Sequence, residues 1–157
     1  MWTRIQLAVS GVSLLLLALP CMAADTIGLC VGDDMRQRLH AEMRDLLGAV
    51  HGVHTALAER DLEALSTRAA AAGTAMAGQI EKHAGSHHAG LPHDFVKIGR
   101  ATHAAFDDLA TLARDGGQDG ELWPALSKVS GYCVQCHAKY RLALPGDCAT
   151  EDEGAGR

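Results

Sequence analysis

A Cys-x-x-Cys-His run at residues 133–137 constrains the fold of this chain more than any other feature. On a helix, Cys133, Cys136 and His137 share one face, because they are three and four positions apart. Two thiols so placed can form thioethers with the two vinyl groups of one porphyrin, and the imidazole can bind its iron. The run therefore predicts one covalent haem c, with His137 as the proximal ligand.

A redox dithiol and a zinc site are the alternatives for the same two cysteines. A thioredoxin-like dithiol requires a β-α-β context, and a structural zinc site requires a second pair of ligands at similar spacing. The sequence has neither pattern, so haem attachment is the favoured interpretation.

Residues 1–24 have the features of a secretory signal peptide. Arg4 supplies a positive charge, residues 7–19 are almost wholly apolar, and Ala23 and Ala24 are small residues suited to cleavage. The apolar run is shorter than the about 20 residues of a spanning helix, so an uncleaved anchor is the less favoured alternative. We expect no membrane span after cleavage.

The compartment follows from the signal and the haem motif together. Covalent haem attachment occurs outside the bacterial cytoplasm, so both features predict a periplasmic protein. Cys21 invites a lipoprotein interpretation, but Pro20 stands where a small residue would be needed.

The length and the net charge of the chain narrow the class of protein to which it can belong. Residues 25–149 have the size of one domain, and residues 150–157 are expected to be a disordered tail. The formal net charge is −5, and loss of Arg4 with the signal makes it −6. Such a charge argues against a nucleic-acid-binding protein. Aromatic residues are only 4% of the chain while Ala and Leu are abundant, which favours helix over strand.

Four amphipathic helices are predicted from the apolar spacing. The first runs from about residue 33 to 59, with Asp33 or Asp34 as its cap, and the second starts after Asp61 and fades at residues 82–85. The third opens at Asp94 and ends at residues 116–117. The fourth runs from about residue 120 to Pro145. The expected inward positions are Leu39, Met43, Leu46, Val50, Val53 and Leu57; Leu62, Leu65, Ala69, Ala72 and Met76; Phe95, Ile98, Thr102, Ala105, Leu109 and Leu112; and Leu122, Leu126, Val129, Cys133, Cys136, His137 and Tyr140.

Four helices with short links predict an all-α, antiparallel up-down-up-down four-helix bundle, with the haem between helices near one end. A coiled-coil oligomer would need longer unbroken heptads than these glycine-interrupted segments offer. In such a bundle Cys30 and Cys148 lie at the same end, so a disulfide between them is predicted, with two free thiols as the alternative.

Histidines are numerous for so short a chain. His83, His87, His88, His93 and His103 cluster around the start of the third helix and could bind a transition metal, although a solvated polar loop is the favoured interpretation. His51 and His54 are expected on the surface of the first helix.

The chain resembles a known family at the haem motif and beyond it. Residues 133–141 are similar to the C-terminal helix of cytochrome c′ and related class II c-type cytochromes. Residues 105–126 are similar to that family's third helix and following link, and residues 35–43 to the start of its first helix.

The resemblance implies further site residues. Arg141 matches a basic residue beside the proximal histidine and, four positions on, would share the helix face of His137. Arg36 matches an arginine near a haem propionate, and a solvated surface charge is the alternative. His40 stands where the family places an apolar residue over the open iron face, so it is a candidate sixth ligand, with Met35 and Met43 as rivals. Relatives often form homodimers.

Two functions remain open at this point. A six-coordinate site favours electron transfer between periplasmic redox partners, whereas an open site favours binding of a small gas such as nitric oxide or carbon monoxide. We expect no enzyme, since a peroxidase would need a distal acid–base pair that the sequence does not make evident.

Overall fold

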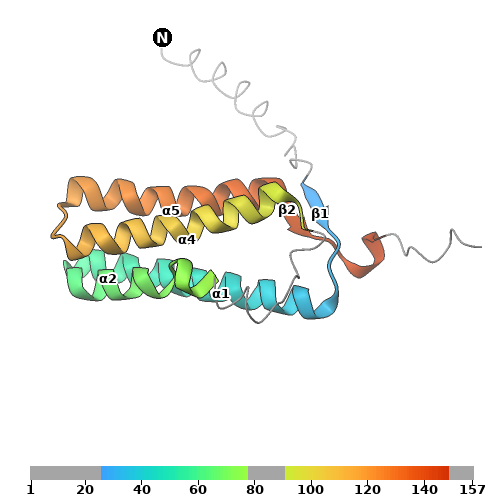
Figure 1. Cartoon of the computed structure of the whole chain (residues 1–157), viewed down its shortest axis with the longest axis horizontal. Helices are drawn as coiled ribbons and strands as arrows, with labels where there is room; N and C mark the ends of the chain where they lie inside the picture. The colour runs from blue at the N-terminus through green and yellow to red at the C-terminus, as the bar shows by residue number, and fades with distance from the viewer. Residues whose placement is uncertain (1–25, 78–90, 149–157) are drawn as a thin grey trace, which may run out of the picture.

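The structure is a computed structural model that describes residues 26–77 and 91–148 of the 157-residue chain. In this part of the chain four helices pack against one another, so the predicted all-α class is confirmed (Figure 1). Helix α4 packs against both α5 and α2, and α2 packs against α1. The elements in chain order are β1 (Ile27–Leu29), α1 (Asp33–Glu59), α2 (Leu62–Ala71), α4 (His93–Arg114), α5 (Asp119–Lys139), β2 (Tyr140–Leu142) and the short 3-10 helix η1 (Pro145–Asp147).

Helix α1 has the bounds that the apolar spacing predicts, but it starts differently. Its N-cap is Gly32, which offers no side-chain cap, and Asp33 and Asp34 lie in the first turn. The predicted capping role of these aspartates is therefore wrong, although their charges suit the positive end of the helix dipole. The predicted cap of α2 is confirmed, since Asp61 Oδ1 accepts a hydrogen bond from the Ala64 N–H at 2.8 Å.

Helix α2 ends at Ala71, and residues 74–77 are helical again after a turn at Ala72 and Gly73, so the predicted continuous helix is broken there. Asp107 on α4 explains the early end, because its Oδ2 accepts hydrogen bonds from the Thr74 N–H (3.0 Å) and hydroxyl (2.6 Å). Gly73 leaves room for this carboxylate, which a Cβ at that position would overlap. The predicted fading of the helix at residues 82–85 lies outside the described residues.

The C-terminal end of α5 also differs from the prediction. The helix ends at Lys139, and Tyr140 is buried in strand β2, so its predicted place on the inward helix face is wrong. Strand β2 pairs in parallel with β1, with Ile27 opposite Tyr140. The Tyr140 ring meets the Phe95 ring edge-on at 5.5 Å between centroids, which fixes the extended conformation.

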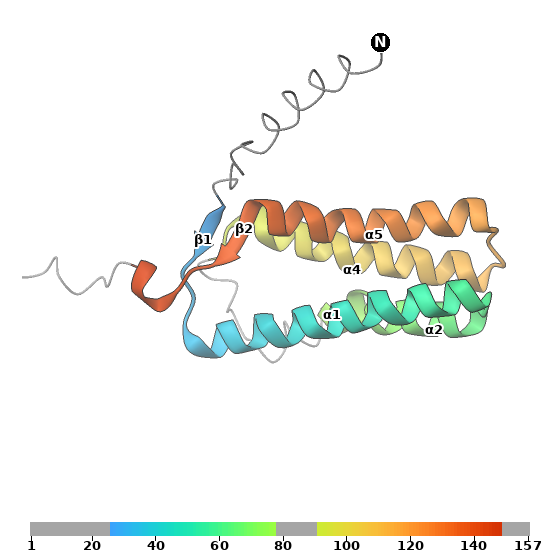
Figure 2. The same cartoon turned by 180° about the vertical axis from the view of Figure 1, so that it is seen from behind.

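The predicted disulfide between Cys30 and Cys148 is confirmed, with 5.6 Å between the two Cα atoms. The strands lie at the end of the bundle where α1 begins and α5 ends (Figure 1). The α1–α2 and α4–α5 connections lie at the other end of the bundle, as the view from behind also shows (Figure 2). The disulfide therefore joins the two chain segments that leave the same end of the bundle.

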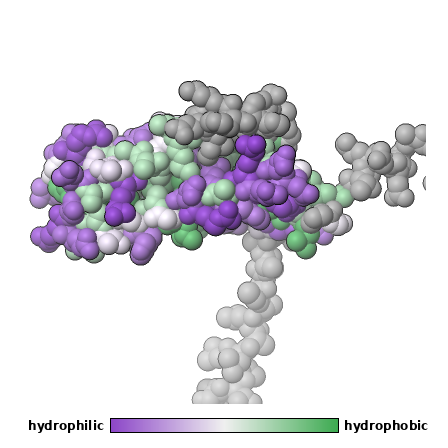
Figure 3. Space-filling view, turned by 90° about the horizontal axis from the view of Figure 1, so that it is seen from below, coloured by the Kyte–Doolittle hydropathy of each residue, from purple (hydrophilic) through white to green (hydrophobic). Residues whose placement is uncertain are grey.

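Two apolar clusters form the core. The larger one fills the half of the bundle that contains α2, and its fully buried side chains are Val53, Leu65, Phe106, Leu109, Leu122, Leu126 and Val129. The smaller cluster joins the two strands to α4 and consists of Leu29 in β1, Tyr140 in β2 and Ile98 in α4. No described helix has both the length and the apolarity needed to cross a membrane. The face seen in Figure 3 mixes hydrophilic and hydrophobic residues along the bundle.

Candidate haem site

A cavity of about 510 Å³ opens among α1, α4 and α5, and its walls include residues that pack on both apolar clusters. Its volume lies within the range of about 300–1,000 Å³ that is typical of ligand sites. The atoms that line it are mainly apolar. The three residues of the haem motif, Cys133, Cys136 and His137, all lie in its wall. Both cysteines are partly buried, but His137 is exposed, so its predicted inward position is wrong.

Helix α5 carries the three motif residues because it continues without a break to Lys139. Its start is fixed by a capping box, in which the Glu121 carboxylate accepts a hydrogen bond from the Gln118 N–H at 3.0 Å. Pro124 lies inside the helix, past its first turn, so its missing N–H removes one helical hydrogen bond without ending α5. Leu122, Leu126 and Val129 are buried on the same side of the helix, and this stripe carries the cysteines into the cavity wall.

The two motif thiols are free, whereas Cys30 and Cys148 are joined. The Cys133 thiol donates to the Val129 carbonyl oxygen at 3.6 Å. Burial raises the pKa of both thiols, and the nearby Cys133 and Glu42 raise the pKa of Cys136 further. Reactive redox dithiols have a lowered pKa, so the surroundings of these cysteines argue against that alternative.

Helix α1 forms one wall of the cavity, opposite the walls formed by α4 and α5. Leu39, Leu46, Met35 and Met43 line the cavity, whereas His40 does not, and its side chain is exposed. The structure therefore brings the two methionines to the site but leaves His40 outside it.

The arginines do not all lie where the family resemblance implies. Arg141 lies in β2 and pairs with Asp147 at 3.3 Å, so the predicted helix face shared with His137 is wrong. Arg36 is half-buried but does not line the cavity, and its Nε is buried without a hydrogen-bond partner among the residues that the structure describes. Arg38 and Arg100, which the sequence did not single out, line the cavity itself.

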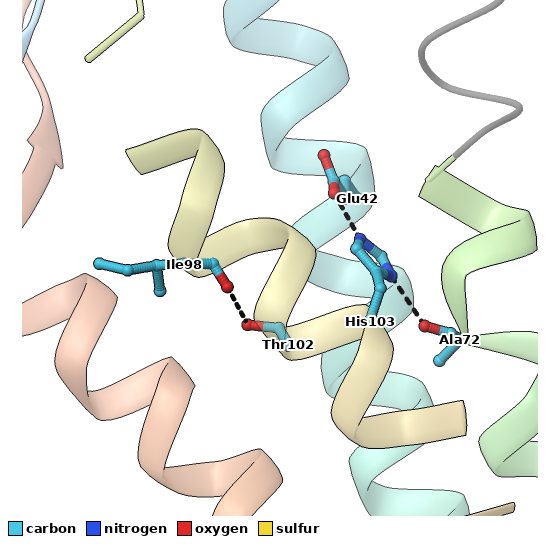
Figure 4. Close-up of polar contacts among 5 residues, drawn as sticks. All are labelled: Glu42, Ala72, Ile98, Thr102 and His103. Carbon is cyan, nitrogen blue, oxygen red and sulfur yellow. Dashed lines mark hydrogen bonds and ion pairs between the residues drawn. The ribbon is translucent and has the colours of Figure 1, made fainter. Parts of the chain in front are cut away.

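His103 is the residue of the site whose role the sequence missed. It is only 2% exposed and lines the cavity from α4. Its Nδ1 lies 2.8 Å from the Ala72 carbonyl oxygen and its Nε2 lies 3.1 Å from Glu42 Oε1 (Figure 4). The signal was available, because a second apolar row, Phe106, Ala110 and Ala113, continues from His103 at helical spacing.

Burial of the His103 ring opposes its protonation and is the largest single influence on its pKa. The hydrogen bonds to Glu42 and Ala72, together with the negative charges of Glu42 and Asp107, outweigh burial and raise the pKa above its ordinary value. When the ring is protonated, it forms an ion pair with the Glu42 carboxylate in the cavity wall.

The remaining histidines that the sequence singled out are either exposed or outside the described residues. His93 is exposed at the start of α4, while His83, His87 and His88 lie outside the described residues. His51 and His54 are exposed as expected, and His54 meets the Trp123 ring at 6.4 Å between centroids. Within residues 26–77 and 91–148, no group of three or more His, Cys, Asp or Glu side chains could hold a metal ion.

Comparison with known proteins yields no match, whether to a protein-family model, to a curated protein or to a solved structure.

Proposed function

We propose that this protein is a periplasmic c-type cytochrome that carries electrons on one covalently bound haem c. Cys133 and Cys136 hold the porphyrin by thioethers, and His137 is the proximal ligand of its iron. The observation that carries the proposal is that Cys133, Cys136 and His137 all line one mainly apolar cavity of about 510 Å³. The bundle around it is antiparallel, up-down-up-down.

The residues around the cavity suit a haem. A porphyrin is largely apolar, as are most of the atoms that line the cavity. Its anionic propionates pair well with guanidinium groups, and Arg38 and Arg100 lie in the cavity wall. Arg36, on α1, has a buried Nε without a partner among the described residues. When bound, the haem supplies a one-electron couple, and the protein supplies its burial, its ligand and the charges around it.

Gas binding is the second candidate function. The side chains that α1 contributes to the cavity wall decide whether the iron has a sixth ligand, and so which function is favoured. Leu39 and Leu46 offer no ligand to the iron, which favours an open site for nitric oxide or carbon monoxide. Met35 and Met43 offer thioethers, which would favour a six-coordinate site and electron transfer. His40 would have to turn its exposed side chain into the cavity to take part.

The absorption spectrum of the reduced protein separates the two functions. Electron transfer predicts a sharp low-spin α-band, and gas binding predicts a broad high-spin band. Spectra of Met35→Leu, Met43→Leu and His40→Ala then identify the sixth ligand, since only loss of that ligand converts a low-spin spectrum. A high-spin spectrum in the unsubstituted protein would contradict electron transfer as the main function.

Haem staining of a denaturing gel tests the attachment. Cys133→Ala and Cys136→Ala should each weaken covalent retention, whereas Cys30→Ala should not. Undiminished staining in the double Cys133→Ala, Cys136→Ala variant would contradict the attachment site.

A further inference from the structure

His103 is placed between two hydrogen-bond acceptors. Its Nδ1 faces the Ala72 carbonyl oxygen at 2.8 Å and its Nε2 faces Glu42 Oε1 at 3.1 Å (Figure 4). A protonated ring donates to both acceptors, whereas a neutral ring carries one N–H and turns a lone pair toward the other oxygen. The geometry therefore favours the imidazolium, in a side chain that is 3% exposed.

The charges around His103 come from every element packed around it. Helix α1 contributes the Glu42 carboxylate, the end of α2 contributes the Ala72 carbonyl, and α4 contributes Asp107 one turn further on. The remaining titratable or charged groups that line the same cavity are Arg38, Arg100, Tyr132, Cys133, Cys136 and His137. Because His103 and Glu42 both line the cavity that the haem would fill, a charge added there acts on the pair through a poorly screened interior.

We infer that His103, held by Glu42, is a proton-binding site that couples proton uptake to electron uptake by the haem. The inference rests on the proposed function. One electron arrives from a redox-partner protein, and one proton from water binds the neutral His103 ring; on oxidation the electron leaves to an acceptor protein and the proton returns to water. Added negative charge in the cavity strengthens proton binding at His103, and the His103 proton in turn favours the reduced state.

The sign of the effect follows from this reciprocity. At low pH the His103–Glu42 pair is neutral overall, and at high pH the loss of one proton leaves the Glu42 charge uncompensated. The midpoint potential should therefore fall as pH rises. A tenfold change in proton concentration changes a one-proton, one-electron equilibrium constant at most tenfold. The midpoint potential should therefore fall by at most 59 mV for each pH unit.

Potentiometric titration of the haem-loaded protein over a series of pH values tests the inference. The unsubstituted protein should lose potential with rising pH, and His103→Gln should remove most of that slope. Glu42→Gln, which keeps a hydrogen-bond acceptor, should move the sloping region to lower pH. His93→Gln is the matched control, because His93 is exposed on the same helix, and should leave the slope unchanged.

Three results would overturn the inference. The first is a slope in His103→Gln equal to that of the unsubstituted protein, and the second is a potential that does not depend on pH. The third applies if the variants do not fold: nitrogen-15 NMR of the unsubstituted protein would then give His103 the same pKa in the oxidised and reduced forms. Haem bound without these effects would contradict the coupling alone, whereas a chain that binds no haem would contradict the proposed function as well.

Discussion

The Cys30–Cys148 disulfide should be among the strongest single contributions to the stability of this bundle. It joins residues that are 118 positions apart in the sequence, one before α1 and the other after α5. The loop-entropy relation for a closed loop of this length gives about 5 kcal/mol. Since small domains have a total stability of about 5–15 kcal/mol, the double variant Cys30→Ser, Cys148→Ser should lose a third or more of it.

Urea denaturation of the haem-loaded protein measures this loss, followed by far-ultraviolet circular dichroism. The variant should show a lower midpoint, and the unsubstituted protein treated with dithiothreitol should reproduce it. The thioethers that we propose at Cys133 and Cys136 are not disulfides, so this reductant should leave the haem attached. The comparison therefore isolates the single bond between Cys30 and Cys148.

The result also bears on the strands. Each strand has only three residues, and a two-stranded pair of this size is marginal in water by itself. Loss of the disulfide should therefore also loosen the pairing of β1 with β2, seen as faster amide exchange at Ala143, whose N–H donates to the Leu29 carbonyl oxygen at 3.1 Å. A change in unfolding free energy of less than about 1 kcal/mol, under both treatments, would refute the reasoning.

Three further predictions concern the packing and the charges. Gly73→Ala should destabilise the fold by about 1–3 kcal/mol in urea denaturation because its Cβ would overlap the Asp107 carboxylate, whereas Gly48→Ala, with open space around it, should not destabilise it. Asp61→Ala should cost about 1 kcal/mol through the lost cap of α2, and Asp61→Asn, which keeps an acceptor, should cost much less; equal losses would contradict the cap. His103 has a raised pKa, so the stability that its protonated form contributes is complete below the ordinary value of 6.5 and is lost as pH rises through the folded value. Unfolding free energies measured across that range should therefore fall with pH in the unsubstituted protein and stay flatter in His103→Gln; parallel curves would contradict this.

Local signals in the sequence predict much of the fold. The alternating apolar steps predict α1 close to its observed bounds, although its predicted aspartate cap is wrong. Asp61 and the glycines at 116–117 mark helix ends because caps and left-handed turns depend on a few neighbouring residues. The motif on α5 places Cys133, Cys136 and His137 in one cavity wall for the same reason, since helical periodicity alone fixes their common face.

Contacts between distant residues decide what the sequence could not predict. No local stop signal stands at Lys139, and α5 ends there because Tyr140 pairs with Ile27 and packs on Phe95. Arg141 consequently lies away from the helix face of His137. His103 is buried because its two acceptors are 31 and 61 residues away along the chain, a pairing that only the folded bundle creates.

Intact-mass spectrometry of the denatured protein, exported from a host with active haem-ligation machinery, tests the central claim most directly. The account predicts the mass of the processed polypeptide plus one haem, and loss of that addition when Cys133 and Cys136 are both replaced by alanine. A polypeptide that carries no added mass after export from such a host would contradict it.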